Sequence, residues 1–156
     1  MTGVQTCALP ICEAGREALD RFYADHRDEP LIVDKWFALQ AMSPAPQTLD
    51  TVEALMKHPA FSIGNPNRVR SLVGSFATGN MTQFNRRDGA GYRFLARIVA
   101  ALDASNPQVA ARLLAALRSW RDLEPIRQDA ARRALESVRA AAASPDVRDI
   151  VARTLA

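Results

Sequence analysis

The residues most able to do chemistry in this chain are two neighbouring arginines, Arg68 and Arg70, in the motif NPNRVR. The Asn-Pro pair before them predicts a helix start, so both cations would lie in the first turn or two of that helix. The helix dipole disfavours cations at this end. Their position therefore indicates either a carboxylate partner or an anionic ligand, and of the two a salt bridge to a neighbouring repeat is the commoner arrangement.

A second pair, Gln108 and Arg112, lies four positions apart in the motif NPQVAAR. This spacing places both side chains on one face of a helix, opposite the apolar stripe that contains Leu113 and Leu117. By this pattern alone the face would be exposed to solvent.

Patterns for metal binding and for catalysis are missing from the rest of the sequence. His26 and His58 lie far apart and belong to no His-x-x-x-His pair. We expect both at helix ends, where a histidine cation meets the negative end of the dipole. The segment DGAGY lacks the strand and the spacing of a dinucleotide fingerprint, and a helix N-cap at Asp88 explains it more simply. Serines within helical patterns have no histidine at a spacing suited to a catalytic triad.

Helices must position these residues, because apolar side chains recur at the i, i+3, i+4, i+7 spacing nearly throughout the chain. No alternation with a period of two lasts long enough to indicate a strand. Residues 30–42, PLIVDKWFALQAM, are apolar nearly all round and predict a helix buried between neighbours.

Three helix starts recur at a regular interval. Asn65, Asn106 and Ser144 each precede a proline, so that a side-chain oxygen caps a free N–H and the proline loses no hydrogen bond. The starts lie about 40 residues apart, which is the length of a HEAT or armadillo repeat. Because one helical hairpin cannot bury both of its faces, such hairpins stack. The sequence therefore predicts an all-α fold of stacked antiparallel helical hairpins that form an armadillo/HEAT-like superhelical bowl.

The opening segment, MTGVQTCALPIC, differs from everything that follows. It holds both cysteines of the chain, Cys7 and Cys12, but no charged residue and no helical period. A secretory signal, a lipoprotein attachment site and a metal half-site each fit it poorly. A common sequencing-library adapter, read in frame, translates into residues 1–11 without a mismatch. We therefore expect residues 1–12 to be an unstructured translated adapter, and residues 13–156 to be one domain of a longer parent protein.

Composition favours a globular domain, with 48% hydrophobic and 24% charged residues. No apolar run approaches the roughly 20 residues that a membrane span needs. The absence of cysteine from residues 13–156 suits a reducing compartment, and we expect a cytoplasmic location. The net charge of +3 is a mild excess that is more typical of a solvated surface than of a nucleic-acid footprint. Neither a membrane nor a nucleic acid is expected as a partner.

Three segments together resemble the C-terminal domain of the bacterial aminopeptidase N family, the zinc-dependent alanyl aminopeptidases of the gluzincin class. They are VDKWFALQAMSP, HPAFSIGNPNRVRSLVGSFATGN and DGAGYRFLARIVAALDASNPQVAARL. The resemblance implies a four-domain enzyme whose last domain is a helical bowl that closes over the active site. In that family the catalytic domain binds one zinc through His-Glu-x-x-His and a downstream Glu, and the metal activates a water molecule.

The resemblance implies that this chain holds no catalytic residue, metal ligand or cofactor, and that it is inactive alone. Its partners would be the catalytic and N-terminal domains of the same parent chain, and peptide substrates. Gln108 matches a residue that lines the pocket for the first side chain of the substrate, and Arg112 matches an arginine that can meet peptide carboxylates or carbonyls. Arg68 and Arg70 match arginines at the inner surface of the domain, where they would contact either a ligand or a neighbouring domain.

The alternative function is a free-standing helical-repeat module that binds protein or nucleic acid through an arginine-lined face. That alternative predicts retention on nucleic acid with a steep salt dependence, whereas the family predicts weak retention. As the isolated domain of a larger enzyme, the chain should also expose an apolar surface and associate partially with itself.

Overall fold

The computed structural model describes residues 13–156, and the predicted adapter segment, residues 1–12, lies outside them. Within the described residues every regular element is a helix, which confirms the all-α prediction. The α-helices in chain order are α1 (Glu13–His26), α2 (Pro30–Ala41), α3 (Thr48–Leu55), α4 (Pro66–Val69), α5 (Ser75–Gly79), α6 (Met81–Phe84), α7 (Ala90–Asp103), α8 (Pro107–Leu113), α9 (Pro125–Ala141) and α10 (Pro145–Leu155).

Three short helical turns of other geometry, η1 to η3, complete the architecture. A π-helical turn, η1 (Arg70–Gly74), joins α4 to α5, so that the three elements form one continuous helix. The 3-10 turn η2 (Leu114–Leu117) extends α8, and a second 3-10 turn, η3 (Trp120–Asp122), precedes α9.

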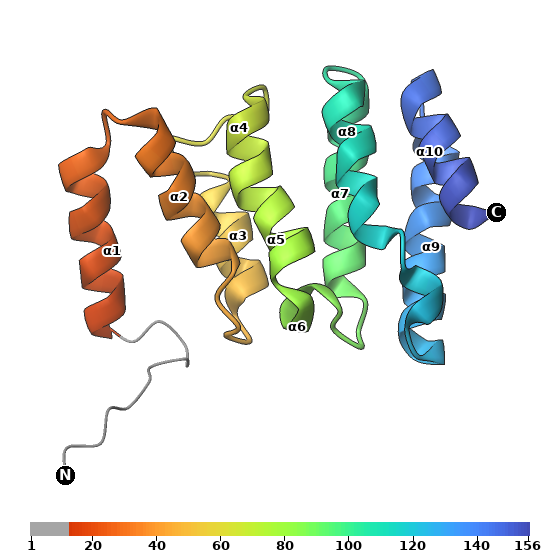
Figure 1. Cartoon of the computed structure of the whole chain (residues 1–156), viewed down its shortest axis with the longest axis horizontal. Coiled ribbons are helices and arrows are strands. Elements are labelled where there is room, and N and C mark those ends of the chain that lie inside the picture. Colours follow the sequence, from red (N-terminus) through yellow and green to blue (C-terminus); the bar gives the residue numbers. More distant parts are fainter. Residues whose placement is uncertain (1–12) are drawn as a thin grey trace, which may run out of the picture.

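The helices pair into antiparallel hairpins that stack side by side (Figure 1). Helix α7 packs on α8 and α9, and α10 packs on the same two helices, so α7–α8 and α9–α10 are adjacent hairpins. Towards the N-terminus, α2 packs on α3 and on the α4–η1–α5 helix, and α1 packs on α2. This arrangement is the stack of hairpins that the repeat spacing predicts.

Helices α2, α4, α8 and α10 each begin with a proline, and their N-terminal ends lie at one edge of the stack, uppermost in Figure 1. The three predicted side-chain caps are confirmed, because each accepts a hydrogen bond from a main-chain N–H of the first helical turn. The cap and donor residues are Asn65–Asn67, Asn106–Val109 and Ser144–Val147, at 3.0, 3.2 and 3.2 Å.

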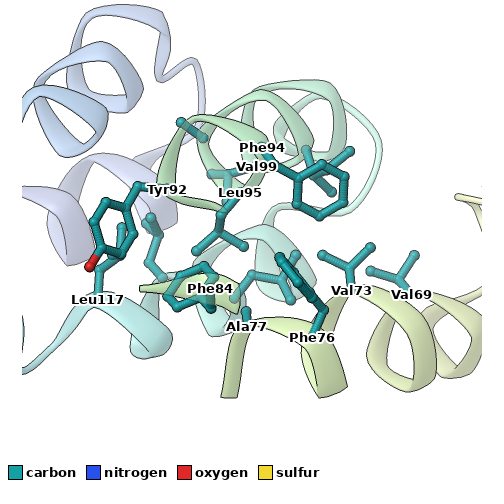
Figure 2. Close-up of a cluster of buried hydrophobic side chains, with 14 of the residues drawn as sticks. Val69, Val73, Phe76, Ala77, Phe84, Tyr92, Phe94, Leu95, Val99 and Leu117 are labelled. Carbon is teal, nitrogen blue, oxygen red and sulfur yellow. The ribbon is translucent and has the colours of Figure 1, made fainter. Parts of the chain in front are cut away.

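A shared hydrophobic core joins the α4–η1–α5 helix to α6 and α7 (Figure 2). The ring of Phe76 meets the rings of Phe84 and Phe94 edge-on, at centroid distances of 6.0 and 5.7 Å. Tyr92 is fully buried beside Phe84, and its hydroxyl donates to Oδ1 of Asn85 at 2.9 Å. Because edge-to-face aromatic pairs prefer specific geometries, this cluster fixes the relative position of the two helical segments.

Gly91, in the first turn of α7, permits the close approach of α6. A Cβ atom on Gly91 would lie 2.2 Å from the main-chain oxygen of Phe84. The preceding Gly89 is the N-cap of α7 and has φ of 68°, a left-handed conformation that glycine adopts without a steric penalty. The predicted N-cap at Asp88 is therefore wrong by one residue, although Oδ1 of Asp88 still accepts from the N–H of Ala90 at 3.0 Å.

Helix α1 is held by an aromatic cluster that includes a histidine. Nε1 of Trp36 donates to the main-chain oxygen of Leu19 at 3.0 Å, and Tyr23 packs on Trp36 at a centroid distance of 4.8 Å. The ring of His58 also contacts Tyr23, at 4.8 Å, and its Nδ1 accepts from the N–H of Ala60 at 3.1 Å. Burial lowers the pKa of His58 below its usual value.

The sequence predicted the position of His26 better than that of His58. His26 is the last residue of α1, as predicted, and its Nδ1 lies 2.7 Å from a carboxylate oxygen of Glu29. His58 lies beyond the end of α3 and packs among aromatic rings. Its position therefore reflects tertiary packing more than a helix dipole.

Asp103 connects the last two hairpins. It is buried at the end of α7, and its Oδ2 accepts hydrogen bonds from the N–H groups of Ala143 and Ser144, at 2.6 and 3.1 Å. Burial alone would raise the pKa of Asp103, but the hydrogen bonds from Ser144 and Ala143 outweigh it and hold this pKa below its usual value. The carboxylate thus fixes the loop between α9 and α10 against α7. Across the described residues no helix is both long enough and apolar enough to cross a membrane.

Candidate functional site

Arg68 is engaged inside the domain. Its guanidinium forms an ion pair with Asp34 of α2 and donates to the main-chain oxygens of Pro30 and Ala60, at 2.9 and 3.0 Å. The side chains of Arg68 and Asp34 are only 11% and 15% exposed. The guanidinium also lies over the ring of Phe37, 5.8 Å from its centroid. These contacts join α4 to α2 and favour the salt-bridge alternative for Arg68.

Arg70 and Arg112 face a common groove. The groove has a volume of about 290 Å³ and separates the α4–η1–α5 helix from α8. Arg70 lies on one wall and Arg112 on the other, and both side chains are exposed. Each guanidinium can donate to a carbonyl or a carboxylate in the groove.

Gln108 lies one turn before Arg112 on α8 and is exposed, but it does not line this groove. The opposite face of the same helical segment is buried through Leu113 and Leu117, as the sequence predicts. The structure therefore brings Arg70 and Arg112 together, leaves Gln108 beside Arg112, and holds Arg68 apart from them.

The π-helical turn η1 forms part of the groove wall through Arg70 and Gly74. Such turns contain an extra residue, and they occur frequently at functional sites because they change the direction of the side chains that follow. Sequence periodicity did not reveal this turn, because Val69, Leu72, Val73 and Phe76 fit an ordinary helical stripe.

Two further arginine-lined grooves were not foreseen from the sequence. One, of about 650 Å³, lies between α7 and α9, and the other, of about 450 Å³, lies between α8–η2 and α10. The arginines of each groove come from segments that are distant in the sequence, so no local motif predicts either groove. For the groove between α8–η2 and α10, the recurrence of arginine at positions 112, 118 and 121 is a partial signal in the sequence.

Residues 13–156 do not fit a metal site. No group of three or more His, Cys, Asp or Glu side chains in this part of the chain is arranged to hold a metal ion. The zinc that the resemblance implies would therefore need ligands from elsewhere in the parent protein.

The fold and these grooves define a helical-repeat domain with arginine-rich surfaces. Residues 3–156 match the family described as "Domain of unknown function (DUF3458_C) ARM repeats", and the chain belongs to this family. It corresponds to the C-terminal ARM-repeat domain of bacterial aminopeptidase N, as the resemblance predicted.

Three relatives, each named aminopeptidase N, illustrate the similarity. The protein of Caulobacter vibrioides is 46% identical over 122 residues, which cover 78% of this chain and 14% of the relative. The Haemophilus influenzae protein is 50% identical over 106 residues, which cover 68% of this chain and 12% of the relative. The Escherichia coli protein is 44% identical over 125 residues, which cover 80% of this chain and 14% of the relative. The chain thus spans only about one seventh of these relatives.

A solved structure supports the same correspondence. The crystal structure of Legionella pneumophila aminopeptidase A in complex with aspartic acid matches with a TM-score of 0.88 and 33% sequence identity. The match covers 92% of this chain and 17% of that one.

Proposed function

We propose that this chain walls the substrate cavity of a cytoplasmic zinc metallo-aminopeptidase that releases N-terminal residues from peptides, and that it is not catalytic alone. The observation that carries the proposal is the 46% identity over 122 residues to the aminopeptidase N of Caulobacter vibrioides. The catalytic and N-terminal domains of the same parent chain would be its partners, and the catalytic domain would supply the zinc.

The groove between the α4–η1–α5 helix and α8 gives the cavity role a physical basis. Arg70 and Arg112 offer charged donors on its two walls, and Gln108 offers an amide one turn away on α8. These groups can bind and orient a peptide through its carbonyl and carboxylate oxygens. The hydroxyls of Ser75 and Thr78 also line this groove, but no histidine or carboxylate lines it to act as a general base. The contribution of the groove would therefore be to substrate affinity and orientation.

An exposed apolar strip on α2 supports docking to other domains of the parent chain. Leu31 is 74% exposed and Leu39 is 60% exposed, and Met42 continues the same face at the end of the helix. Three large apolar side chains exposed on one side of a helix favour an interaction site, with the exposed Lys35 lying between Leu31 and Leu39. Leu31, Leu39 and Met42 form the α2 strip.

The first experiment tests catalytic dependence. The purified chain is incubated with an alanine chromogenic substrate and added zinc, and the release of the chromophore is followed. We expect no hydrolysis above the zinc-only blank. Zinc-dependent turnover by this chain alone would overturn the assignment as a non-catalytic domain.

The second experiment tests the cavity role in a complete enzyme. The matching 125-residue segment of the Escherichia coli aminopeptidase N is replaced by the corresponding part of this chain. We expect the chimera to be active, and Q108A and R112A to raise KM for short alanine peptides more than they lower kcat. R139A, which removes an exposed arginine of α9, is the matched control and should leave both constants unchanged. Unchanged KM in Q108A and R112A would contradict the cavity role but not the family.

The alternative of a free-standing nucleic-acid-binding module is favoured only by the arginine-lined grooves. A duplex-DNA column distinguishes the two functions. The aminopeptidase proposal predicts elution at low salt, whereas the module predicts strong retention with a steep dependence on salt concentration.

A further inference from the structure

The groove between α8–η2 and α10 has an unusual lining. Four arginines contribute to it, and no acidic side chain does. The remaining lining is apolar apart from one threonine, and its volume of about 450 Å³ lies in the range of small-molecule sites. The arginines are Arg112, Arg118, Arg121 and Arg153.

Two of these arginines are fixed by neighbouring groups. Arg121 donates to the main-chain oxygens of Thr154 and Leu155, at 2.9 and 2.7 Å, and lies 4.5 Å above the ring of Trp120. It thereby caps the last carbonyls of α10. Arg153 forms an exposed ion pair with Asp149 one turn earlier on α10, at 2.9 Å.

The other two, Arg112 and Arg118, form no ion pair with any residue among 13–156, and both are exposed. Arg112 forms the shared wall between this groove and the one that Arg70 lines. The groove therefore carries positive charge that the described part of the chain leaves uncompensated. Guanidinium groups placed together in this way attract a planar anion, because two N–H groups can donate to its two oxygens.

The groove between α7 and α9 provides the contrast. It is also arginine-lined, but acidic residues stand among its arginines. Arg97 pairs with Glu53 at 2.5 Å, and Arg133 pairs with Asp129. The charge of the α7/α9 groove is therefore largely neutralised by neighbouring carboxylates, in contrast to that of the α8–η2/α10 groove.

We propose that the α8–η2/α10 groove binds the carboxylate side chains of acidic peptides. The donors are Arg118, which forms no ion pair within residues 13–156, and Arg153 of α10, whose exposed ion pair with Asp149 leaves other N–H groups of its guanidinium free to donate. Ala111, Ala115 and Ile150 form an apolar floor that suits the methylene groups of a glutamate. The groove holds two or three residues of a peptide rather than a long polyanion, because its volume is limited and Asp149 stands beside Arg153. The proposal adds a ligand class to the proposed peptide cavity, and it is tested on this chain without a catalytic domain.

Calorimetric titration of the 156-residue chain with acetylated, amidated tri-glutamate tests this binding. The matched peptide is tri-glutamine, which keeps length and methylene content but lacks charge. We expect tri-glutamate to bind at least about tenfold more tightly than tri-glutamine at low salt, since a charge-assisted contact contributes a factor of this order. Equal affinity for the two peptides would overturn the proposal.

The variant R118Q/R153Q locates the site. It should lose about tenfold or more in affinity for tri-glutamate. The control R133Q/R139Q removes the same net charge from α9, and R133Q breaks an ion pair spaced like that of Arg153. Circular dichroism and thermal unfolding verify that both variants fold. Loss of affinity in the control but not in R118Q/R153Q would overturn the assignment of the groove.

Two competitors complete the test. Inorganic phosphate and a short oligothymidylate are titrated under the same conditions. We expect both to bind more weakly than tri-glutamate. Tighter binding of either one, abolished by R118Q/R153Q, would overturn the assignment to carboxylates. Failure of any of these arms would leave the chimera results unaffected, so this proposal and the proposed function fail separately.

Discussion

Arg68 of α4 and Asp34 of α2 form an ion pair across 34 positions of sequence. Two main-chain oxygens, from Pro30 and Ala60, also accept from the same guanidinium. A cation at a helix N-terminus is thus stabilised by the neighbouring helix. This pairing separates Arg68 from Arg70, which the sequence motif places only two residues away.

The first prediction concerns this pair of arginines. R68A should lower the free energy of unfolding by about 2–3 kcal/mol, because it leaves Asp34 and two main-chain oxygens without their donor. R70A should change it by less than about 0.5 kcal/mol, as expected for an exposed side chain. Urea unfolding followed by circular dichroism measures both. Similar losses in the two variants would contradict the structural role of Arg68.

A second prediction concerns Asp103. D103A removes the acceptor of the N–H groups of Ala143 and Ser144, and should lower the free energy of unfolding by about 2 kcal/mol. D149A, which breaks only an exposed ion pair on α10, is the control and should behave like the unchanged protein. Hydrogen exchange should show faster opening of the loop between α9 and α10 in D103A only. Unaltered exchange there would exclude Asp103 as the connection between the two hairpins.

The third prediction tests the close approach at α7. G91A places a Cβ against the main chain of Phe84 and should lower the free energy of unfolding by about 3 kcal/mol or prevent folding. G64A is the control, because its Cβ would lie 3.7 Å from the nearest atom, an ordinary contact. Thermal unfolding compares the two variants. A G91A protein as stable as G64A would show that α6 and α7 are not packed as described.

Acid should weaken the domain through His58. Burial lowers the pKa of folded His58 below that of the unfolded chain, about 6.5. The unfolded state therefore binds more protons below this pH, and the free energy of unfolding decreases as the pH falls from about 6.5 through the folded pKa. H58N keeps an acceptor for the N–H of Ala60 but does not titrate, so it should reduce this decrease. Urea titrations at a series of pH values measure it, and an undiminished decrease in H58N would exclude His58 as the cause.

The α2 strip should mediate partial self-association of the isolated chain. L31K/L39K should remove this association, because both side chains are largely exposed and their replacement leaves the core unchanged. I126K, which alters an exposed isoleucine on α9, is the control and should still associate. Sedimentation velocity over a range of concentrations distinguishes them. A chain that is monomeric throughout that range would contradict this role of the strip.

Local features of the fold could be predicted from the sequence. The caps at Asn65, Asn106 and Ser144 depend on side chains that reach only two or three residues along the chain, so their residue types were sufficient. The burial of Leu113 and Leu117 opposite Gln108 and Arg112 followed from helical periodicity. The family resemblance came from short motifs as well, two of which contain the caps at Asn65 and Asn106.

Contacts between hairpins could not be predicted in this way. The pairing of Arg68 with Asp34, the hydrogen bonds of Asp103, and the gathering of Arg118 with Arg153 depend on how far each hairpin is shifted and rotated against the next. That register is decided by the packing of buried side chains such as Phe76 and Phe84, which belong to different helices. Sequence alone therefore determined the helices and their repeat, because these rest on neighbouring residues. Only the tertiary structure decided which arginines are held inside the domain and which face a groove.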